Sequence, residues 1–231
     1  MVLGKLHHTF VPLWIEVAAD KTGPRYHLPV HDLSAFVLAG GKSSRMGMDK
    51  AFLQLNGETL LDRALQVAAT ITENVRIVGD QHKFGAFHYA VIPDVYRDRG
   101  PLGGIHAALC TTNSNLNLVL ALDMPLVSGE FLVFLVNQAR QSGATITVPN
   151  AGGGLQPLCA VYRKQFAEIA EQSLQAGKNR IDPLFSRVTC RAIAEHELTQ
   201  AGFSVEIFRN VNTPEDLETT QRLAFGRNVN R

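Results

Sequence analysis

The sequence predicts one α/β domain in which helices cover both faces of a mostly parallel β-sheet. Short apolar and β-branched runs alternate with stretches of helical periodicity from residue 34 onward. The strand-like runs are apolar throughout, as expected where both faces of a sheet are buried. The chain has 231 residues, of which 45% are hydrophobic, and this is enough for one sizeable core.

The first half of the domain supplies four predicted strands with helices between and after them. The strands are SAFVLA, VRIVG, YAVIPD and NLVLALD, which start at Ser34, Val75, Tyr89 and Asn117. Helices are predicted in TLLDRALQVAAT, GGIHAALC and EFLVFLVNQAR, the first from apolar residues spaced three and four apart. Strand–helix–strand units cross over with one hand, so these strands should run parallel.

The second half continues the alternation with shorter elements. Strands are predicted in ATITVP and LCAVYR and near Thr189 and Val205, and helices near residues 164–175, near Asp182 and from Thr213. The glycine-rich NAGGGLQP is expected to be a mobile connection. Residues 1–33 have mixed polarity and no sustained period, so we expect an N-terminal extension of little order before a domain at 34–231.

The composition excludes several classes of function. The net charge is +1 and charges of both signs are mixed along the chain, so no nucleic-acid partner is expected. No segment approaches the roughly 20 apolar residues of a membrane span, and the N-terminus does not resemble a signal peptide, so we expect a cytoplasmic protein. Three widely spaced cysteines favour buried thiols over disulfides or structural zinc.

The stretch AGGKSSRMGMDK, after the first predicted strand, is the strongest candidate for a binding site. Gly40 and Gly41 would let backbone N–H groups approach phosphate oxygens, and Arg45 and Lys50 would neutralise the charge. A tight turn beside a solvated basic segment is the other interpretation, which the flanking cations make less favourable. A P-loop would need glycine where Phe36 stands, and GxGxxG does not fit either.

Polar residues also follow the other three strands of the first half. Gly79 and Asp80 follow the second strand, Asp94 the third and Asp123 the fourth. Ligands of open parallel sheets bind beyond the carboxyl ends of the strands, so these residues should lie near one another. Asp123 could bind Mg²⁺, or it could cap a helix or form a turn before Pro125, and its position alone does not decide between these roles.

Four motifs in order give the chain a family resemblance. LAGGKSSRMGMDK, GPLGGI, LALDMP and NVNTPEDL are similar to motifs of the molybdenum cofactor guanylyltransferase family, the MobA-like nucleotidyltransferases. The likeness runs from about Ala35 to Leu223. It implies a single three-layer Rossmann-like nucleotidyltransferase domain. It also implies transfer of GMP from GTP to the molybdenum–molybdopterin cofactor, with Mg²⁺ as cofactor and release of pyrophosphate.

The resemblance also implies roles for residues of the nucleotide site. Leu38, Ala39 and Gly40 would contact the nucleotide, and Lys50 would bind GTP. Asp94 would lie in the same site. A member of the family has an asparagine where this chain has Gly79, so the base or ribose contact of that position is not expected here unless Asp80 substitutes.

For the phosphates and the second substrate, the resemblance points to four further residues. Asp123 would hold Mg²⁺ and phosphate, and Arg45 would face the triphosphate. Asn210 and Asn212 would line the region where the second substrate arrives, and Asn212 could be a further metal ligand. Other proteins of cofactor biosynthesis and molybdoenzyme chaperones are the expected partners.

Two kinds of alternative remain open. An enzyme of the same fold could use CTP or activate a sugar phosphate, because no residue fixes the choice of base. A non-catalytic module could instead bind GTP or the cofactor without turnover. Retention of both Lys50 and Asp123 favours the enzyme, because simple binding could survive without a metal carboxylate.

Overall fold

The structure is a computed structural model that describes residues 16–20, 23–26, 32–40, 49–96 and 98–228. Its centre is an eight-stranded sheet with strand order β10-β9-β11-β8-β3-β6-β7 and with β12 beside β9. The strands are β3 (Leu33–Leu38), β6 (Val75–Val78), β7 (Ala90–Ile92), β8 (Leu116–Ala121), β9 (Ile146–Ala151), β10 (Gly154–Leu155), β11 (Cys159–Arg163) and β12 (Cys190–Ala194).

The first half of the domain forms the parallel part of this sheet. β3 pairs in parallel with β8 and with β6, and β6 pairs in parallel with β7. The four strands predicted in this half are therefore confirmed, together with their direction. Their carboxyl ends meet at one edge of the sheet, which is where a ligand site was expected.

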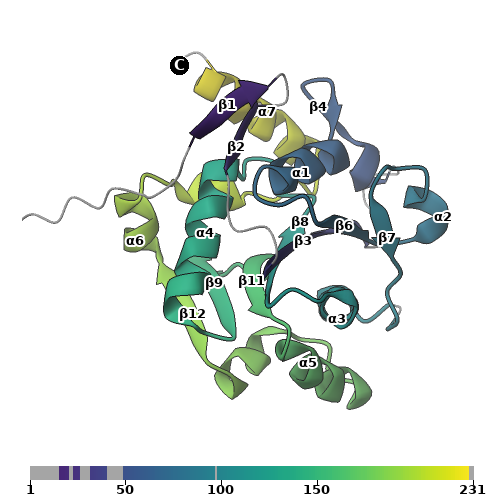
Figure 1. The fold of residues 1–231 in the computed structure, drawn as a ribbon. Coiled ribbons are helices and arrows are strands. Elements are labelled where there is room, and N and C mark those ends of the chain that lie inside the picture. The colour runs from purple at the N-terminus through teal and green to yellow at the C-terminus, as the bar shows by residue number, and fades with distance from the viewer. Residues whose placement is uncertain (1–15, 21–22, 27–31, 41–48, 97, 229–231) are drawn as a thin grey trace, which may run out of the picture.

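Helices form a layer on each face of the sheet (Figure 1). α1 (Leu60–Ala69) and α4 (Gly129–Ser142) pack with Val37 and Leu120 on one face. α3 (Pro101–Thr111) and α5 (Phe166–Gln175) pack with Phe36 on the other. This confirms the three-layer α/β prediction. Among the described residues, no helix has the length and apolar character needed to cross a lipid bilayer.

Side-chain caps mark where the two helices of the first layer begin. The Thr59 hydroxyl accepts the N–H of Asp62 at 3.1 Å at the start of α1. The Ser128 hydroxyl accepts the N–H of Phe131 at 3.3 Å at the start of α4, which ends at Gly143 with φ 64°. A left-handed glycine after a helix satisfies its last carbonyls at little steric cost, so the sequence sets both ends of α4.

β11 lies antiparallel between β8 and β9, which the sequence did not predict. Its pairs include Cys159 with Leu120 and Val161 with Thr147. NAGGGLQP, expected to be a mobile connection, contains the turn of a hairpin in which Ala151 pairs with Gly154. Gly152 and Gly153 have φ of 61° and 86°, so the two glycines supply the positive φ that a two-residue hairpin turn needs.

The prediction of a strand near Val205 is wrong. Residues Val205–Phe208 form the 3-10 helix η4, in which the Ser204 hydroxyl accepts the N–H of Glu206 at 3.2 Å. Ile207 and Phe208 are adjacent and both buried, whereas a strand would send them to opposite faces. The segment is apolar, as a buried strand would be, but the Ser204 cap at its start indicates a helical turn.

Other short elements agree with the sequence or were missed by it. The predicted short helix near Asp182 is the 3-10 helix η3 (Asp182–Arg187), and the predicted closing helix is α7 (Pro214–Asn228). The missed elements are α2 (Gln81–Phe84), α6 (Glu195–Gln200), the 3-10 turn η2 (Lys50–Phe52) and the hairpin of β4 (Gln54–Leu55) with β5 (Glu58–Thr59).

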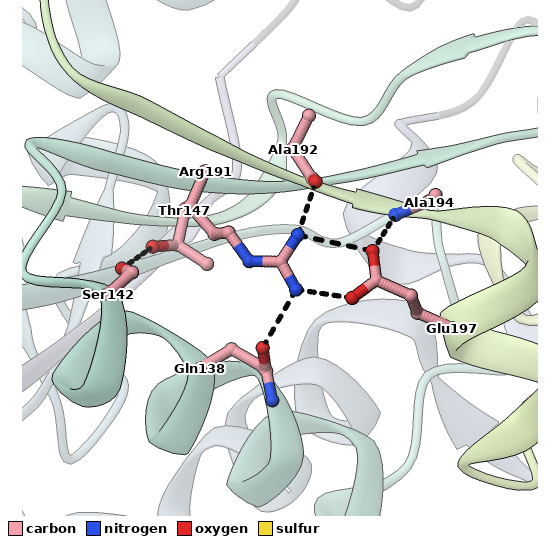
Figure 2. Close-up of polar contacts among 7 residues, drawn as sticks. All are labelled: Gln138, Ser142, Thr147, Arg191, Ala192, Ala194 and Glu197. Atoms are coloured by element: carbon pink, nitrogen blue, oxygen red, sulfur yellow. Dashed lines mark hydrogen bonds and ion pairs between the residues drawn. The ribbon is translucent and has the colours of Figure 1, made fainter.

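An ion pair between Arg191 and Glu197 joins α6 to the sheet (Figure 2). The two guanidinium N–H groups donate to the two carboxylate oxygens at 3.1 and 2.5 Å. Arg191 also donates to Gln138 of α4 at 3.2 Å and to the carbonyl of Ala192 at 2.8 Å. Glu197 accepts the N–H of Ala194 at 2.9 Å, which caps α6 from within the helix.

The N-terminal part contains more regular structure than the sequence suggested. β1 (Glu16–Asp20) and β2 (Gly23–Tyr26) form an antiparallel pair. β3 starts at Leu33, one residue before the expected boundary, and the Asp32 carboxylate accepts the N–H of Asn115 at 3.0 Å. The division into an extension and a domain at 34–231 stays a prediction.

Candidate active site

A cavity of about 690 Å³ opens at the carboxyl ends of the parallel strands. It is lined by predicted site residues from all four strand ends, which are Leu38, Ala39, Gly40, Lys50, Gly79, Asp80, Asp94 and Asp123. Asn210 and Asn212 are not part of this lining, and Gly41 and Arg45 lie outside the described residues. The structure therefore brings most of the predicted residues together, while their roles stay predictions.

Backbone hydrogen bonds hold the strand ends level at the rim of the cavity. The N–H of Ala39 donates to the carbonyl of Val78 at 2.9 Å, and the N–H of Gly79 donates to that of Ile92 at 2.9 Å. The hydrogen bonding between the parallel strands thus continues past the ends of β3 and β6. Gly40 and Asp80 therefore come directly after backbone that is held in place. This is a suitable platform for binding groups that must be placed accurately.

Lys50 and Asp123 form the polar centre of the site. The Lys50 ammonium lies 3.3 Å from Asp123 Oδ2 and also donates to the Asn212 side-chain oxygen. Asp123 Oδ1 is buried and has no hydrogen-bond partner among the residues that the structure describes. A buried carboxylate oxygen without a partner is costly, and such an atom at a cavity suggests a missing cation or donor.

The segment before α7 is tied to this centre through the backbone. The N–H of Val211 donates to the carbonyl of Asp123 at 2.8 Å. Asp216, in the first turn of α7, accepts the N–H groups of Asn212 and Thr213 at 2.9 Å each. Asn212 is thereby held beside Lys50, whereas Asn210 is exposed and has no part in this contact.

Gly79 has a packing reason that explains the departure from the family pattern. A Cβ at this position would lie 2.8 Å from the Phe84 ring, which is 1% exposed and fills the space. Asp80 next to it caps α2, because its Oδ1 accepts the N–H of His82 at 2.8 Å. Position 79 therefore offers no side chain for the expected contact to the base or ribose. Whether Asp80 makes this contact instead stays a prediction.

Asp94 packs against the first turn of α3. A Cβ at Gly103 would lie 2.8 Å from both Asp94 carboxylate oxygens, so only glycine allows this approach. Partial burial raises the pKa of Asp94, and the hydrogen bond from the N–H of Tyr96 at 2.9 Å opposes this shift. Asp94 is thus a polar group held at fixed distance from the start of α3.

The start of α3 also faces the cavity. Gly100, Pro101 and Gly104 line it, and no side chain caps the helix at Gly100, whose φ is 66°. The first N–H groups of an uncapped helix are suited to an anion. The sequence had left this segment open between an anion-binding helix start and a plain surface loop, and the structure places it in the cavity wall.

The lining residues that the sequence analysis did not single out include Asp49, Lys83, Phe84 and Asp98. Asp49 lies in the GKSSRMGMDK motif and is the N-cap of a short helical turn. Aspartate is a preferred N-cap residue, and this preference could have identified Asp49 from the sequence. Lys83 forms an ion pair with Asp49, and burial lowers its pKa. No sequence pattern points to Lys83, because α2 has only four residues.

Metal-binding side chains are sparse in the part of the chain that the structure describes. It contains no group of three or more His, Cys, Asp or Glu side chains placed to hold a metal ion. All three cysteines are free thiols, but Cys110 and Cys190 are exposed, so the prediction of buried thiols is wrong for these two. Cys159 is buried, and burial raises its pKa to about 12. Any metal at Asp123 would therefore depend on a bound ligand for most of its coordination.

Comparisons with known proteins agree with this arrangement. A family model described as a MobA-like NTP transferase domain matches residues 35–192. A "Probable molybdenum cofactor guanylyltransferase" of Pelotomaculum thermopropionicum is 36% identical over 189 residues, which are 81% of this chain and 91% of that protein. The molybdenum cofactor guanylyltransferase of Syntrophotalea carbinolica is 31% identical over 194 residues, covering 84% and 92%.

The fold is also similar to that of a solved structure. Molybdopterin-guanine dinucleotide biosynthesis protein A from Archaeoglobus fulgidus superposes with a TM-score of 0.75 at 26% identity. The match covers 84% of this chain and 99% of that one. The arrangement of the sheet and its helices thus has a counterpart in that protein.

Proposed function

Because the chain belongs to the MobA-like NTP transferase family, we propose that it is a molybdenum cofactor guanylyltransferase. It would transfer GMP from GTP to the molybdenum–molybdopterin cofactor and release pyrophosphate. The relatives that carry this name cover most of the chain, which supports the same activity here. The observation that carries the proposal in the structure is the Lys50–Asp123 pair at the end of an open cavity.

The polar centre fits the phosphates of a nucleotide. Lys50 supplies a positive charge beside Gly40, where the backbone lacks a Cβ that could block an approaching phosphate; a Cβ there would meet nothing within 4 Å. The start of α3 adds the positive end of the helix dipole to the cavity wall, although Pro101 has no N–H and the N–H of Gly103 already donates to the Gly100 carbonyl at 3.2 Å. Donors that are already fixed stabilise charge as it develops without reorganisation, which is the largest contribution in many enzymes.

Asp123 fits Mg²⁺ because its buried Oδ1 has no partner in the described part of the chain. Mg²⁺ is usually bound by one or two carboxylates together with substrate phosphates, which matches a site with so few protein ligands. Asp123 would hold the ion and Asn212 could add an amide oxygen. When bound, the ion would neutralise charge on the phosphate oxygens.

The reaction requires alignment more than it requires a protein nucleophile. A terminal phosphate oxygen of the molybdopterin would form a bond to the α-phosphorus of GTP, while the bond from that phosphorus to the pyrophosphate oxygen breaks. The attacking phosphate monoester is largely ionised near neutral pH, so no general base is needed. Lys50 would stabilise the charge, and the cavity walls would hold the two substrates in line.

GTP as the donor follows the activity named for the relatives and is part of the proposal. A cytidylyltransferase or a sugar-phosphate nucleotidyltransferase would use the same polar centre. A non-catalytic module that binds GTP or the cofactor would not need the unpartnered oxygen of Asp123. Delivery proteins as partners and the cytoplasm as location stay predictions that accompany this proposal.

One incubation tests the proposal. The full-length protein is mixed with Mg²⁺, GTP and molybdenum-loaded molybdopterin, and the guanine dinucleotide and pyrophosphate are measured. We expect both products in equal amounts, and no dinucleotide when CTP replaces GTP. Turnover with CTP alone would assign the cytidylyltransferase activity, and tight GTP binding without any product would favour the non-catalytic module.

A further inference from the structure

Lys83 has no role in the function proposed above, yet its ammonium contacts three side chains. Its ammonium pairs with the Asp49 carboxylate and lies over the rings of Phe52 and Phe84, at 5.9 and 5.0 Å from their centroids. These distances are within the range of cation–π attraction. Burial lowers the pKa of Lys83, so the contacts replace water that the ammonium has lost.

Two of these contacts lie on either side of Lys50 in the sequence. Lys50, Ala51 and Phe52 form the 3-10 turn η2, and Asp49 is its N-cap. Asp49 Oδ1 accepts the N–H of Ala51 at 2.9 Å, and Oδ2 binds Lys83. A single carboxylate therefore closes the turn and joins it to α2.

The core holds the middle of the same turn. Ala51 is fully buried, at 0% exposed, and packs in the cluster beneath α1 and α4. The backbone of Lys50 is thus fixed on both sides, and its side chain extends to Asp123. A lysine side chain loses rotamer entropy when its ammonium is held in one place, so a fixed backbone favours one direction of the ammonium.

We propose that Lys83 is a positioning residue, which holds Asp49 and Phe52 and thereby fixes the turn that presents Lys50 to Asp123. The inference rests on the proposed function only where Lys50 is taken to bind GTP. The coupling between Lys83 and Lys50 is expected in the protein before any nucleotide binds. Lys83 acts through Lys50 and does not itself contact the nucleotide.

The coupling is tested first in the absence of nucleotide. The full-length protein is treated with limiting acetic anhydride, and acylation of Lys50 is followed by mass spectrometry of its peptides. In Lys83→Met the rate at Lys50 should rise about 3-fold or more, an effect typical of directly coupled neighbours. The ammonium of Lys50 would then spend less time paired with Asp123.

Two matched variants and one control sharpen this measurement. Asp49→Asn keeps an N-cap oxygen for Ala51 but loses the charge that binds Lys83, so it should also raise the rate. Lys83→Arg keeps the cation and should remain near the wild-type rate. Lys178→Met changes an exposed lysine outside the cavity lining and should have no effect. An unchanged rate in both Lys83→Met and Asp49→Asn, with unfolding temperatures near wild type, overturns the proposal.

A double-mutant cycle tests the consequence for binding. Calorimetric titration with Mg²⁺ and GTP should show affinity about 3- to 10-fold weaker in Lys83→Met. The same change in a Lys50→Ala background should cause no further loss. If the two losses multiply instead, Lys83 contacts the nucleotide directly and the positioning role is overturned. If the wild type binds no GTP, the proposed function fails, and the acylation rates alone decide the coupling.

Discussion

Two of the cation–carboxylate pairs in the structure differ in how many hydrogen bonds their carboxylate oxygens accept. In the Arg191–Glu197 pair, both carboxylate oxygens accept hydrogen bonds, and the guanidinium also binds Gln138 and Ala192 (Figure 2). In the Lys50–Asp123 pair, one carboxylate oxygen is buried without a partner among the described residues. Within this part of the chain, the carboxylate of the first pair is fully hydrogen-bonded and that of the second is not.

This difference separates a structural role from a functional one. A bidentate pair whose carboxylate oxygens both accept hydrogen bonds joins secondary-structure elements, here β12, α4 and α6, and needs no ligand. A buried polar group without a partner destabilises the protein, and binding of a ligand to that group can offset the loss. We therefore expect substitutions in the two pairs to affect different properties, stability in one and activity in the other.

The largest expected effect is on catalysis by Asp123→Asn. Removing the carboxylate should lower the rate of pyrophosphate release at least about 100-fold, the scale of losing a strong electrostatic stabiliser. The free energy of unfolding should change by no more than about 1 kcal/mol, because the lost ion pair with Lys50 is partly exposed. Steady-state kinetics and urea unfolding measure the two quantities. A rate near wild type would remove Asp123 from the mechanism.

The opposite result is expected for Arg191→Met. This change leaves the Glu197 carboxylate without its bidentate partner, so the free energy of unfolding should fall by about 1 to 2 kcal/mol. The unfolding temperature should fall by about 2 to 8 °C, as expected for a chain of this size. Activity per folded molecule should stay at the wild-type level. A specific loss of activity without loss of stability would contradict the structural role of this pair.

The smallest expected effect is the pH dependence of the same pair. The hydrogen bond from Arg191 lowers the pKa of Glu197 to about 2, from an ordinary value of 4.5. The stabilisation is therefore fully present above about pH 4.5 and is lost as the pH falls toward 2. Glu197→Gln should be less stable than wild type at pH 7, and the difference should shrink across this window. Equal pH profiles for the two proteins would argue against the shift.

The part of the fold that could be predicted was the part that depends on local pattern. The four parallel strands and their polar ends follow from apolar runs and from the rule that binding residues gather at carboxyl ends. Asp94 and Asp123 were placed correctly for this reason. The antiparallel direction of β11 was not predictable, because it follows from which strands lie beside it.

The missed site residues show a second limit. Lys83 belongs to a helix of four residues, too short to show a period, and it pairs with Asp49, which is far from it in the sequence. The space taken by the Phe84 ring, which excludes a side chain at Gly79, is equally invisible before the chain folds. The ion pair between Lys83 and Asp49 and the space filled by the Phe84 ring depend on the tertiary structure, whereas the ends of strands can be predicted from the sequence.

The contact between Lys50 and Asn212 joins positions 162 apart in the chain. As the protein emerges from the ribosome, the parallel strands are made long before Asn212 exists, and N-terminal parts generally fold first. A nascent chain could therefore build the sheet while the ammonium of Lys50 still lacked one of its two partners. The polar centre would be the last feature to mature, so a chain stopped after residue 192 would retain the whole segment matched by the family model but not a finished site.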